Sequence, residues 1–129
     1  MYRLYDASKE KQGVEVELPG GGSVTVRRWL NPSHRRALGN IAVSNNGRPL
    51  PEDEQERAER EAIVPGVLVG WRDVPFEDEE SGDTTTPAFT EEAARDALVR
   101  FEDFFIDVRN AALQREQFYR ARAETAAKN

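Results

Sequence analysis

The chain of 129 residues has no cysteine, one histidine and only three lysines. These shortages limit the kinds of catalytic and metal-binding site that it can form. Without cysteine it has no disulfide, no thiolate metal ligand and no thiol nucleophile. The single histidine, His34, stands beside Arg35 and Arg36 at the start of a predicted helix, so we interpret it as a surface residue. No spaced carboxylate pair occurs in an apolar setting. We therefore expect neither an enzyme nor a cofactor.

Long apolar runs are also missing, because no stretch approaches the ~20 apolar residues of a membrane span. Residues 1–6 have no apolar run, so no signal peptide is visible. The net charge of −6 argues against nucleic acid as a partner, because binding to phosphates requires a basic face. We expect one soluble, cytoplasmic domain spanning residues 1–129, with a size that supports its own core.

The N-terminal quarter has the pattern of a β-hairpin over about residues 13–29. Val14, Val16 and Leu18 alternate with glutamates, and Val24 and Val26 alternate with polar residues. The glycine-rich segment 19–23 between them lacks the lysine of a phosphate-binding loop and predicts a turn. The fold class predicted is α+β, mainly α: an N-terminal hairpin followed by three to four helices, the last long and amphipathic.

The helical part is predicted to cover about residues 32–126. Asn31 and Pro32 are typical of a helix start, and the segment 45–47 of a helix end. Acidic residues 52–54 favour the start of the next helix. That helix is expected to continue into the apolar segment 62–69, with a kink or break near Pro65.

The segment of about residues 77–87 is strongly acidic, and we expect a mobile surface loop that is dispensable for folding. Its carboxylates lack the alternating spacing of a calcium loop, so we predict no metal site there. Thr90 then caps the last helix, with Glu91 and Glu92 in its first turn.

Residues 88–129 contain neither glycine nor proline, and their apolar residues follow a helical stripe. The stripe comprises Ala94, Ala97, Leu98, Phe101, Phe104, Phe105, Val108, Ala112 and Tyr119. It argues for one continuous helix, with the segment 101–103 as the alternative junction between two helices. The core is predicted to contain Val67, Leu68, Trp71, Phe89, Phe101, Phe105 and Val108.

A second apolar line runs through Val99, Ile106 and Leu113 at a spacing of seven residues, more than about 100° from the stripe. In one interpretation the kinked helix of residues 63–69 covers this line. In the other, the line is extended by Phe118 and forms a partner-binding seam, either between subunits or with a client protein.

Three short motifs occur in the same order along the chain as in the tail assembly chaperones of long-tailed bacteriophages. They are Gly70-Trp71-Arg72-Asp73-Val74, the helix start Phe89-Thr90-Glu91 and the ending Ala127-Lys128-Asn129. Together with the hairpin and the helix that follows it, these motifs make most of the chain resemble that family. Two features differ: the loop after Val74 is longer and more acidic, and Phe101-Glu102 replaces a proline often seen between the last two helices.

The resemblance implies a protein that binds the tape-measure protein in the cytoplasm of the host bacterium and keeps it soluble while the tail tube polymerises. It also implies self-association, absence from the virion, and a longer frameshifted form that recruits tail tube protein. The alternatives are a small head–tail connector or completion protein, which would stay in the virion, and an acidic inhibitor or adaptor whose loop mimics nucleic acid.

Overall fold

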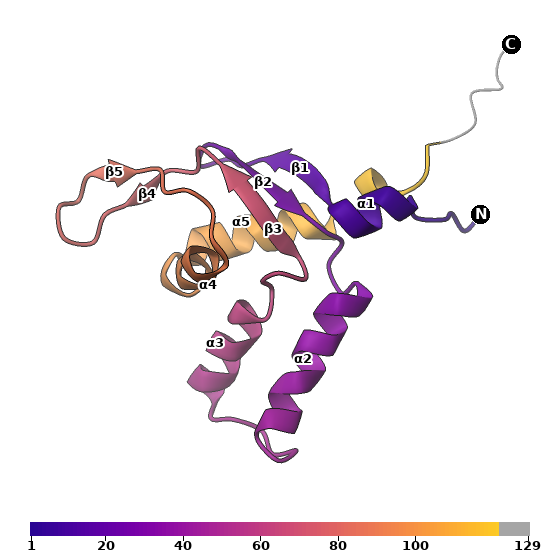
Figure 1. Ribbon diagram of the computed structural model, residues 1–129, viewed down its shortest axis with the longest axis horizontal. Coiled ribbons are helices and arrows are strands. Elements are labelled where there is room, and N and C mark those ends of the chain that lie inside the picture. Colours follow the sequence, from indigo (N-terminus) through magenta and orange to yellow (C-terminus); the bar gives the residue numbers. More distant parts are fainter. Residues whose placement is uncertain (122–129) are drawn as a thin grey trace, which may run out of the picture.

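The computed structural model describes residues 1–121 and shows an α+β fold in which helices predominate (Figure 1). The helices are α1 (Ala7–Gln12), α2 (Pro32–Ser44), α3 (Glu52–Glu61), α4 (Glu91–Arg100) and α5 (Glu102–Leu113), followed by the 3-10 helix η1 (Arg115–Phe118). The strands are β1 (Val14–Glu17), β2 (Ser23–Val26), β3 (Leu68–Arg72), β4 (Phe76–Glu77) and β5 (Thr84–Thr85). The predicted fold class, with its N-terminal hairpin, is confirmed.

The molecule has two parts that differ in packing. The body consists of the antiparallel sheet β1–β2–β3, which packs on α5, and of α4 beside it. The arm consists of α2 and α3, which project from the body side by side (Figure 1).

The hairpin forms as its alternating valines predict. Val14 pairs with Val26, and Val16 pairs with Val24, across the antiparallel strands. Val24 and Val26 are completely buried. The turn needs glycine at position 22, where φ is 72° and a Cβ would lie 2.5 Å from the Asp73 carbonyl oxygen. The turn therefore rests directly on the connection that follows β3.

The apolar segment 62–69 does not continue a helix, which corrects the prediction made from the sequence. Helix α3 ends at Glu61, a turn follows, and Leu68 begins β3, which pairs antiparallel with β2. Val67 and Leu68 are completely buried. The β-branched residues on either side of Leu68 suit a strand, and the free edge of β2 supplies the hydrogen-bonding partners for it.

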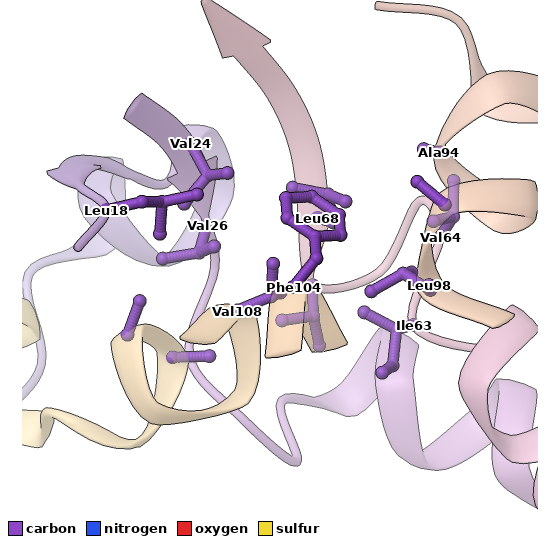
Figure 2. Packing of buried hydrophobic residues seen from close by; sticks show 14 of the residues in the cluster. Leu18, Val24, Val26, Ile63, Val64, Leu68, Ala94, Leu98, Phe104 and Val108 are labelled. Atoms are coloured by element: carbon purple, nitrogen blue, oxygen red, sulfur yellow. The ribbon is translucent and has the colours of Figure 1, made fainter. Parts of the chain in front are cut away.

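The core lies between the sheet, the segment that leads into β3, and the two C-terminal helices (Figure 2). Its members include Leu18, Val24, Val26, Ile63, Val64, Leu68, Ala94, Leu98, Phe104 and Val108. Of the predicted core residues, Val67, Leu68 and Val108 are confirmed as completely buried. Trp71, Phe89, Phe101 and Phe105 are half-buried and pack against the margin of this cluster.

The last helical region is not one continuous helix. Phe101 has an extended backbone with φ −112° and ψ 98°, and it separates α4 from α5. The alternative prediction, a junction between two helices at residues 101–103, is therefore correct. Arg100 at the end of α4 and Glu102 at the start of α5 have the charges that helix ends and starts favour.

The arm is attached at its base by buried polar residues. Asn31 caps α2 as predicted, accepting hydrogen bonds from the N–H groups of Ser33 and His34. Its amide also donates to the carbonyl of Gly66, with an N–O distance of 2.8 Å. His34 was predicted at the surface, and this is wrong, because only 1% of it is exposed. The Gly66 backbone packs so closely on His34 that a Cβ there would lie 3.1 Å from the His34 nitrogen.

The acidic segment forms a small hairpin, in contrast to the unstructured loop expected from its composition. Phe76 pairs with Thr85, and Glu77 pairs with Thr84. At the turn, one carboxylate oxygen of Asp78 accepts hydrogen bonds from the backbone of Glu80 and of the next residue, and these bonds lower the pKa of Asp78. A local turn motif thus orders a segment that buries almost no apolar surface.

Candidate functional site

Five aromatic side chains meet where the end of the sheet faces the junction of α4 and α5. They are Trp71 on β3, Phe76 on β4, Phe89 before α4, Phe101 at the junction and Phe104 in α5. The ring centroid of Phe76 lies 5.0 Å from that of Phe101 and 5.0 Å from that of Phe104. Tilted and edge-on contacts of this kind stabilise an aromatic cluster beyond the burial of its area.

A groove of about 500 Å³ lies beside this cluster, and we name it the acid-rimmed groove. Its apolar lining comprises Leu18, Val74, Pro75, Phe76, Phe101 and Phe104. Its charged lining comprises Glu77, Glu79, Arg100, Asp103 and Asp107. The groove thus joins five parts of the chain: the hairpin turn, the connection after β3, the acidic hairpin, the end of α4 with Phe101, and the first two turns of α5.

Two local features of the sequence create this groove. The turn of the first hairpin approaches the connection after β3 closely, because Gly22 lacks a side chain at the contact with Asp73. On the opposite side, the extended backbone of Phe101 turns its ring towards Phe76 instead of continuing the helical stripe. Without this break the ring would follow the helical stripe of residues 94–112.

The rim carries net negative charge. Arg100 binds Glu79 on the acidic hairpin and Asp96 one turn earlier in α4, and these two partners raise its pKa. Glu77, Asp103 and Asp107 have no ion pair within the part of the chain that the structure describes. Three carboxylates therefore remain available around an apolar floor. Such a surface suits an apolar side chain flanked by arginine or lysine.

The four residues predicted for partner binding do not form one surface. Val99 is half-buried and lines a cleft with Arg57 and Arg60 of α3. Ile106 is half-buried and Leu113 is 43% exposed. A helical turn of 100° per residue places both on the side of α5 away from the buried Phe104.

The predicted extension of that line to Phe118 is wrong, because the Phe118 side chain is completely buried. The 3-10 helix η1 turns it into the core, and the N-terminal segment forms hydrogen bonds with the backbone of Phe118 and Arg120. The Asp6 nitrogen donates to the Phe118 carbonyl at 2.8 Å, and the Arg120 nitrogen donates to the Leu4 carbonyl at 2.9 Å. Phe118 is thus a core residue, and only Ile106 and Leu113 remain on the outer face of α5.

Sequence reasoning did not find the acid-rimmed groove. One signal was available: Asp103 and Asp107 are four residues apart, so that they share a face of α5 next to Phe104. Apart from Arg100 and Phe101, the other lining residues are more than twenty positions away, and no local pattern indicates that they meet. Within residues 1–121 no group of three or more His, Asp or Glu side chains has the geometry to hold a metal ion.

None of the helices in residues 1–121 has the length and apolar character required to cross a membrane. Comparison with protein families gives a match of residues 31–129 to the model described as YdaY prophage protein. The matched region begins at the cap of α2 and contains the arm, β3, the acidic hairpin and the C-terminal helices, but not the first hairpin. Comparisons with curated proteins and with solved structures give no significant match.

Proposed function

The chain belongs to the YdaY prophage protein family and is thus phage-derived, and from this premise we propose that it is a tail assembly chaperone. In this role it binds the tape-measure protein in the host cytoplasm, keeps it soluble while the tail tube polymerises, and is not retained in the virion. A longer frameshifted form would connect it to the tail tube protein. The acid-rimmed groove is the observation that carries this proposal.

The groove has the chemistry that a helical client requires. A tape-measure protein is a long, helix-rich chain with exposed apolar stripes, and a helix lays such a stripe into an apolar groove. The aromatic floor offers Phe76, Phe101 and Phe104, and the rim offers Asp103 and Asp107 to basic residues beside the stripe. Amphipathic segments with lysine or arginine flanking the apolar positions are therefore the expected clients.

Two of the three motifs that carry the resemblance to tail assembly chaperones border this site. Trp71 of the first motif packs edge-on against Phe89, with ring centroids 5.1 Å apart, and donates a hydrogen bond to the carbonyl of Pro87. Thr90 of the second motif caps α4 by accepting from the Ala93 nitrogen. These contacts hold the aromatic cluster that forms the floor of the groove. The third motif, at residues 127–129, lies outside the described residues.

The test is co-expression with the tape-measure protein of the same phage, followed by measurement of the soluble fraction and of co-purification. We expect the chain to raise the soluble fraction and to co-purify. The double variant Asp103→Lys with Asp107→Lys should lose both effects, since it replaces the rim carboxylates with cations. The control Glu91→Lys with Glu92→Lys makes the same charge change outside the groove and should retain both effects.

The outcomes separate the proposal from its alternatives. A wild-type chain that neither solubilises nor binds the tape-measure protein contradicts the chaperone function. Detection of the chain in purified, complete particles favours a connector or completion protein.

An acidic inhibitor or adaptor is the second candidate, because the β4–β5 hairpin projects from the body and carries exposed carboxylates (Figure 1). The double variant Glu80→Gln with Asp83→Asn removes two exposed charges of the hairpin and changes no residue that lines the groove. A chaperone should keep its client in this variant. An inhibitor that mimics nucleic acid should lose its basic partner.

A further inference from the structure

A separate pocket lies where the arm meets the body, and we name it the arm-base pocket. Its volume is about 310 Å³, at the lower end of the range of small-molecule sites. Its apolar lining comprises Trp29, Leu30, Leu38 and Phe105, and its polar lining comprises His34, Glu56, Glu59 and Arg60. The pocket thus joins the segment before α2, both helices of the arm, and α5. No described residue lines both this pocket and the acid-rimmed groove.

His34 gives this pocket a buried hydrogen-bond donor that has no acceptor. Burial lowers the pKa of His34, and its Nδ1 atom accepts from the Leu30 nitrogen, so the one proton of the neutral ring is on Nε2. Within residues 1–121, Nε2 donates to no oxygen atom. In the same residues, the Nε atom of Arg109 is the one fully inaccessible side-chain nitrogen or oxygen without a partner, so the 1% of His34 that solvent reaches includes Nε2. The donor therefore faces the pocket that His34 lines.

Leu30 is held at this pocket in a backbone conformation that leucine rarely adopts. Its φ is 60°, in the left-handed region that favours glycine or asparagine. Its nitrogen donates to His34 and its carbonyl oxygen accepts from Arg35, and these two bonds fix the conformation. The Leu30 side chain is 40% exposed, so burial within the chain compensates little of the strain. Such strain is typical of functional sites, and here it places a leucine side chain at the pocket.

The charges at the pocket are unevenly paired. The guanidinium of Arg60 binds Glu56 and lies 4.2 Å from the centroid of the Phe105 ring. Glu59 accepts a hydrogen bond from the Gln55 amide, but it has no ion pair within the part of the chain that the structure describes. A carboxylate without a counter-charge favours an amino group on a ligand and disfavours a phosphate.

These features define a ligand by its chemistry. The aromatic and aliphatic walls suit a planar ring, the His34 N–H requires an acceptor on that ring, and the Glu59 carboxylate requires an amino donor. Cytosine and adenine carry an exocyclic amino group and ring acceptors, and a glutamate that accepts from the amino group of cytosine is a usual pairing in base recognition. The net charge of −6, which argues against a nucleic acid chain, does not oppose an uncharged nucleoside.

We propose that the arm-base pocket binds the amino-substituted base of a nucleoside, of the cytosine or adenine type. The base lies against Trp29, Leu30 and Phe105. Its ring acceptor takes a hydrogen bond from Nε2 of His34, and its amino group donates to Glu59. Because the lining comes from the arm and from α5, a bound base also links the arm to the body. This inference does not rest on the chaperone function or on the acid-rimmed groove.

The test is a titration of the isotope-labelled full chain with cytidine and with adenosine, followed by NMR spectroscopy at neutral pH. We expect amide shifts confined to the residues in and beside the pocket, together with a shift of the His34 Nε2 resonance caused by the new hydrogen bond. Uridine is the matched control ligand, because a carbonyl replaces the amino group of cytidine. It should bind about tenfold more weakly than cytidine, or worse.

Leu30→Gly separates the pocket from the fold. Glycine is favoured at a φ of 60°, so the variant should melt at or above the wild-type temperature. It loses the leucine side chain in the pocket, so its Kd for the nucleosides should rise about tenfold. Asn46→Gly is the matched control, because Asn46 also has a positive φ, 55°, but lies beyond α2 and outside the pocket. That variant should bind like the wild type.

Glu59→Gln tests recognition of the amino group. Glutamine is uncharged and accepts a weaker hydrogen bond, so the preference for cytidine over uridine should decrease. The same change at Glu52, exposed at the start of α3 and outside the pocket, should leave this preference unchanged. The absence of shifts with both cytidine and adenosine overturns the proposal. So do shifts located outside the pocket, equal binding of uridine and cytidine, or an unchanged Kd in Leu30→Gly.

Discussion

The body and the arm hold together by different forces. The body buries a continuous set of apolar side chains, among them Val24, Leu68, Val108 and Phe118, each completely inaccessible to solvent. In the arm, α3 has no buried residue, and α2 has one, His34. The arm is positioned by the hydrogen bonds of Asn31 and His34 at the base of α2 and by Arg60 of α3, which binds Glu102 of the body.

The difference shows how a small domain presents a helix without weakening its core. Hydrophobic burial is not directional, whereas buried hydrogen bonds require a defined geometry and are costly to leave unmade. A few polar contacts at residues 30–34 can therefore set the direction of the arm, while its outer surface remains free for a partner. The body tolerates little change in its core, and the arm tolerates much change at its surface.

The largest expected effect comes from the core of the body. Phe118→Ala should destabilise the protein by about 3–5 kcal/mol, because it removes a completely buried aromatic side chain and leaves a cavity. The matched change in the arm, Val43→Ala, should alter stability by no more than about 0.5 kcal/mol. Chemical denaturation of both variants gives the comparison. Equal losses would show that the arm is as tightly packed as the body.

The next effect concerns the polar attachment of the arm. Asn31→Ala should cost about 2 kcal/mol, because it removes the cap of α2 and leaves the Gly66 carbonyl without its side-chain partner. Asn45 is the control: its amide bonds the Arg48 carbonyl in an exposed position, so Asn45→Ala should cost less than about 1 kcal/mol. Similar losses of unfolding free energy in the two variants would mean that the burial of Asn31 contributes nothing to stability.

A smaller effect depends on pH. The Nδ1 atom of His34 accepts a hydrogen bond from the Leu30 nitrogen at 3.0 Å, and burial lowers the pKa of His34 below its ordinary value of 6.5. Above pH 6.5 the ring is neutral in both the folded and the unfolded chain. As the pH falls below 6.5, the unfolded chain takes up the proton first, so the free energy of unfolding should decrease.

Glu56, Glu59 and Arg60 of α3 line the same pocket as His34. Melting temperatures between pH 7.5 and pH 5.5 measure the decrease in stability. The variant His34→Gln loses this titration and should have a flatter profile than the wild type over the same range. A wild-type profile no steeper than that of the variant would show that His34 does not titrate between these limits.

The elements that could be predicted from the sequence are those determined by neighbouring residues. The alternating valines specify the first hairpin, and Asn31 and Thr90 cap helices as their types favour. Strand β3 could not be predicted in this way, since its hydrogen bonds come from β2 about forty-five residues earlier. Val67 and Val69 favour a strand, but a short apolar run alone does not distinguish a strand from a buried helix, and the free edge of β2 decides between them.

The same distinction between local and long-range contacts explains which parts of the candidate site could be predicted. Asp103 and Asp107 share a face of α5 by helical spacing alone, and the charge change around Phe101 marks the junction. The walls at Leu18 and Val74 become neighbours only after the sheet has formed. His34 was misplaced for a similar reason, because the backbone that buries it, at Gly66, is distant in the sequence.

A last change in stability tests whether the outer side of α5 belongs to the body. Leu113 is 43% exposed and Ile106 is half-buried, so Ile106→Asp with Leu113→Asp should cost only about 1–2 kcal/mol and leave the circular dichroism spectrum unchanged. A buried line would behave differently, because an unpaired charge in the core is strongly destabilising. If these residues contact a partner, the folded double variant should lose either its multimers or its client. Loss of folding would assign the outer side of α5 to the core. A folded variant with unchanged assembly and unchanged client binding would remove Ile106 and Leu113 from any interface and leave the acid-rimmed groove as the site to test.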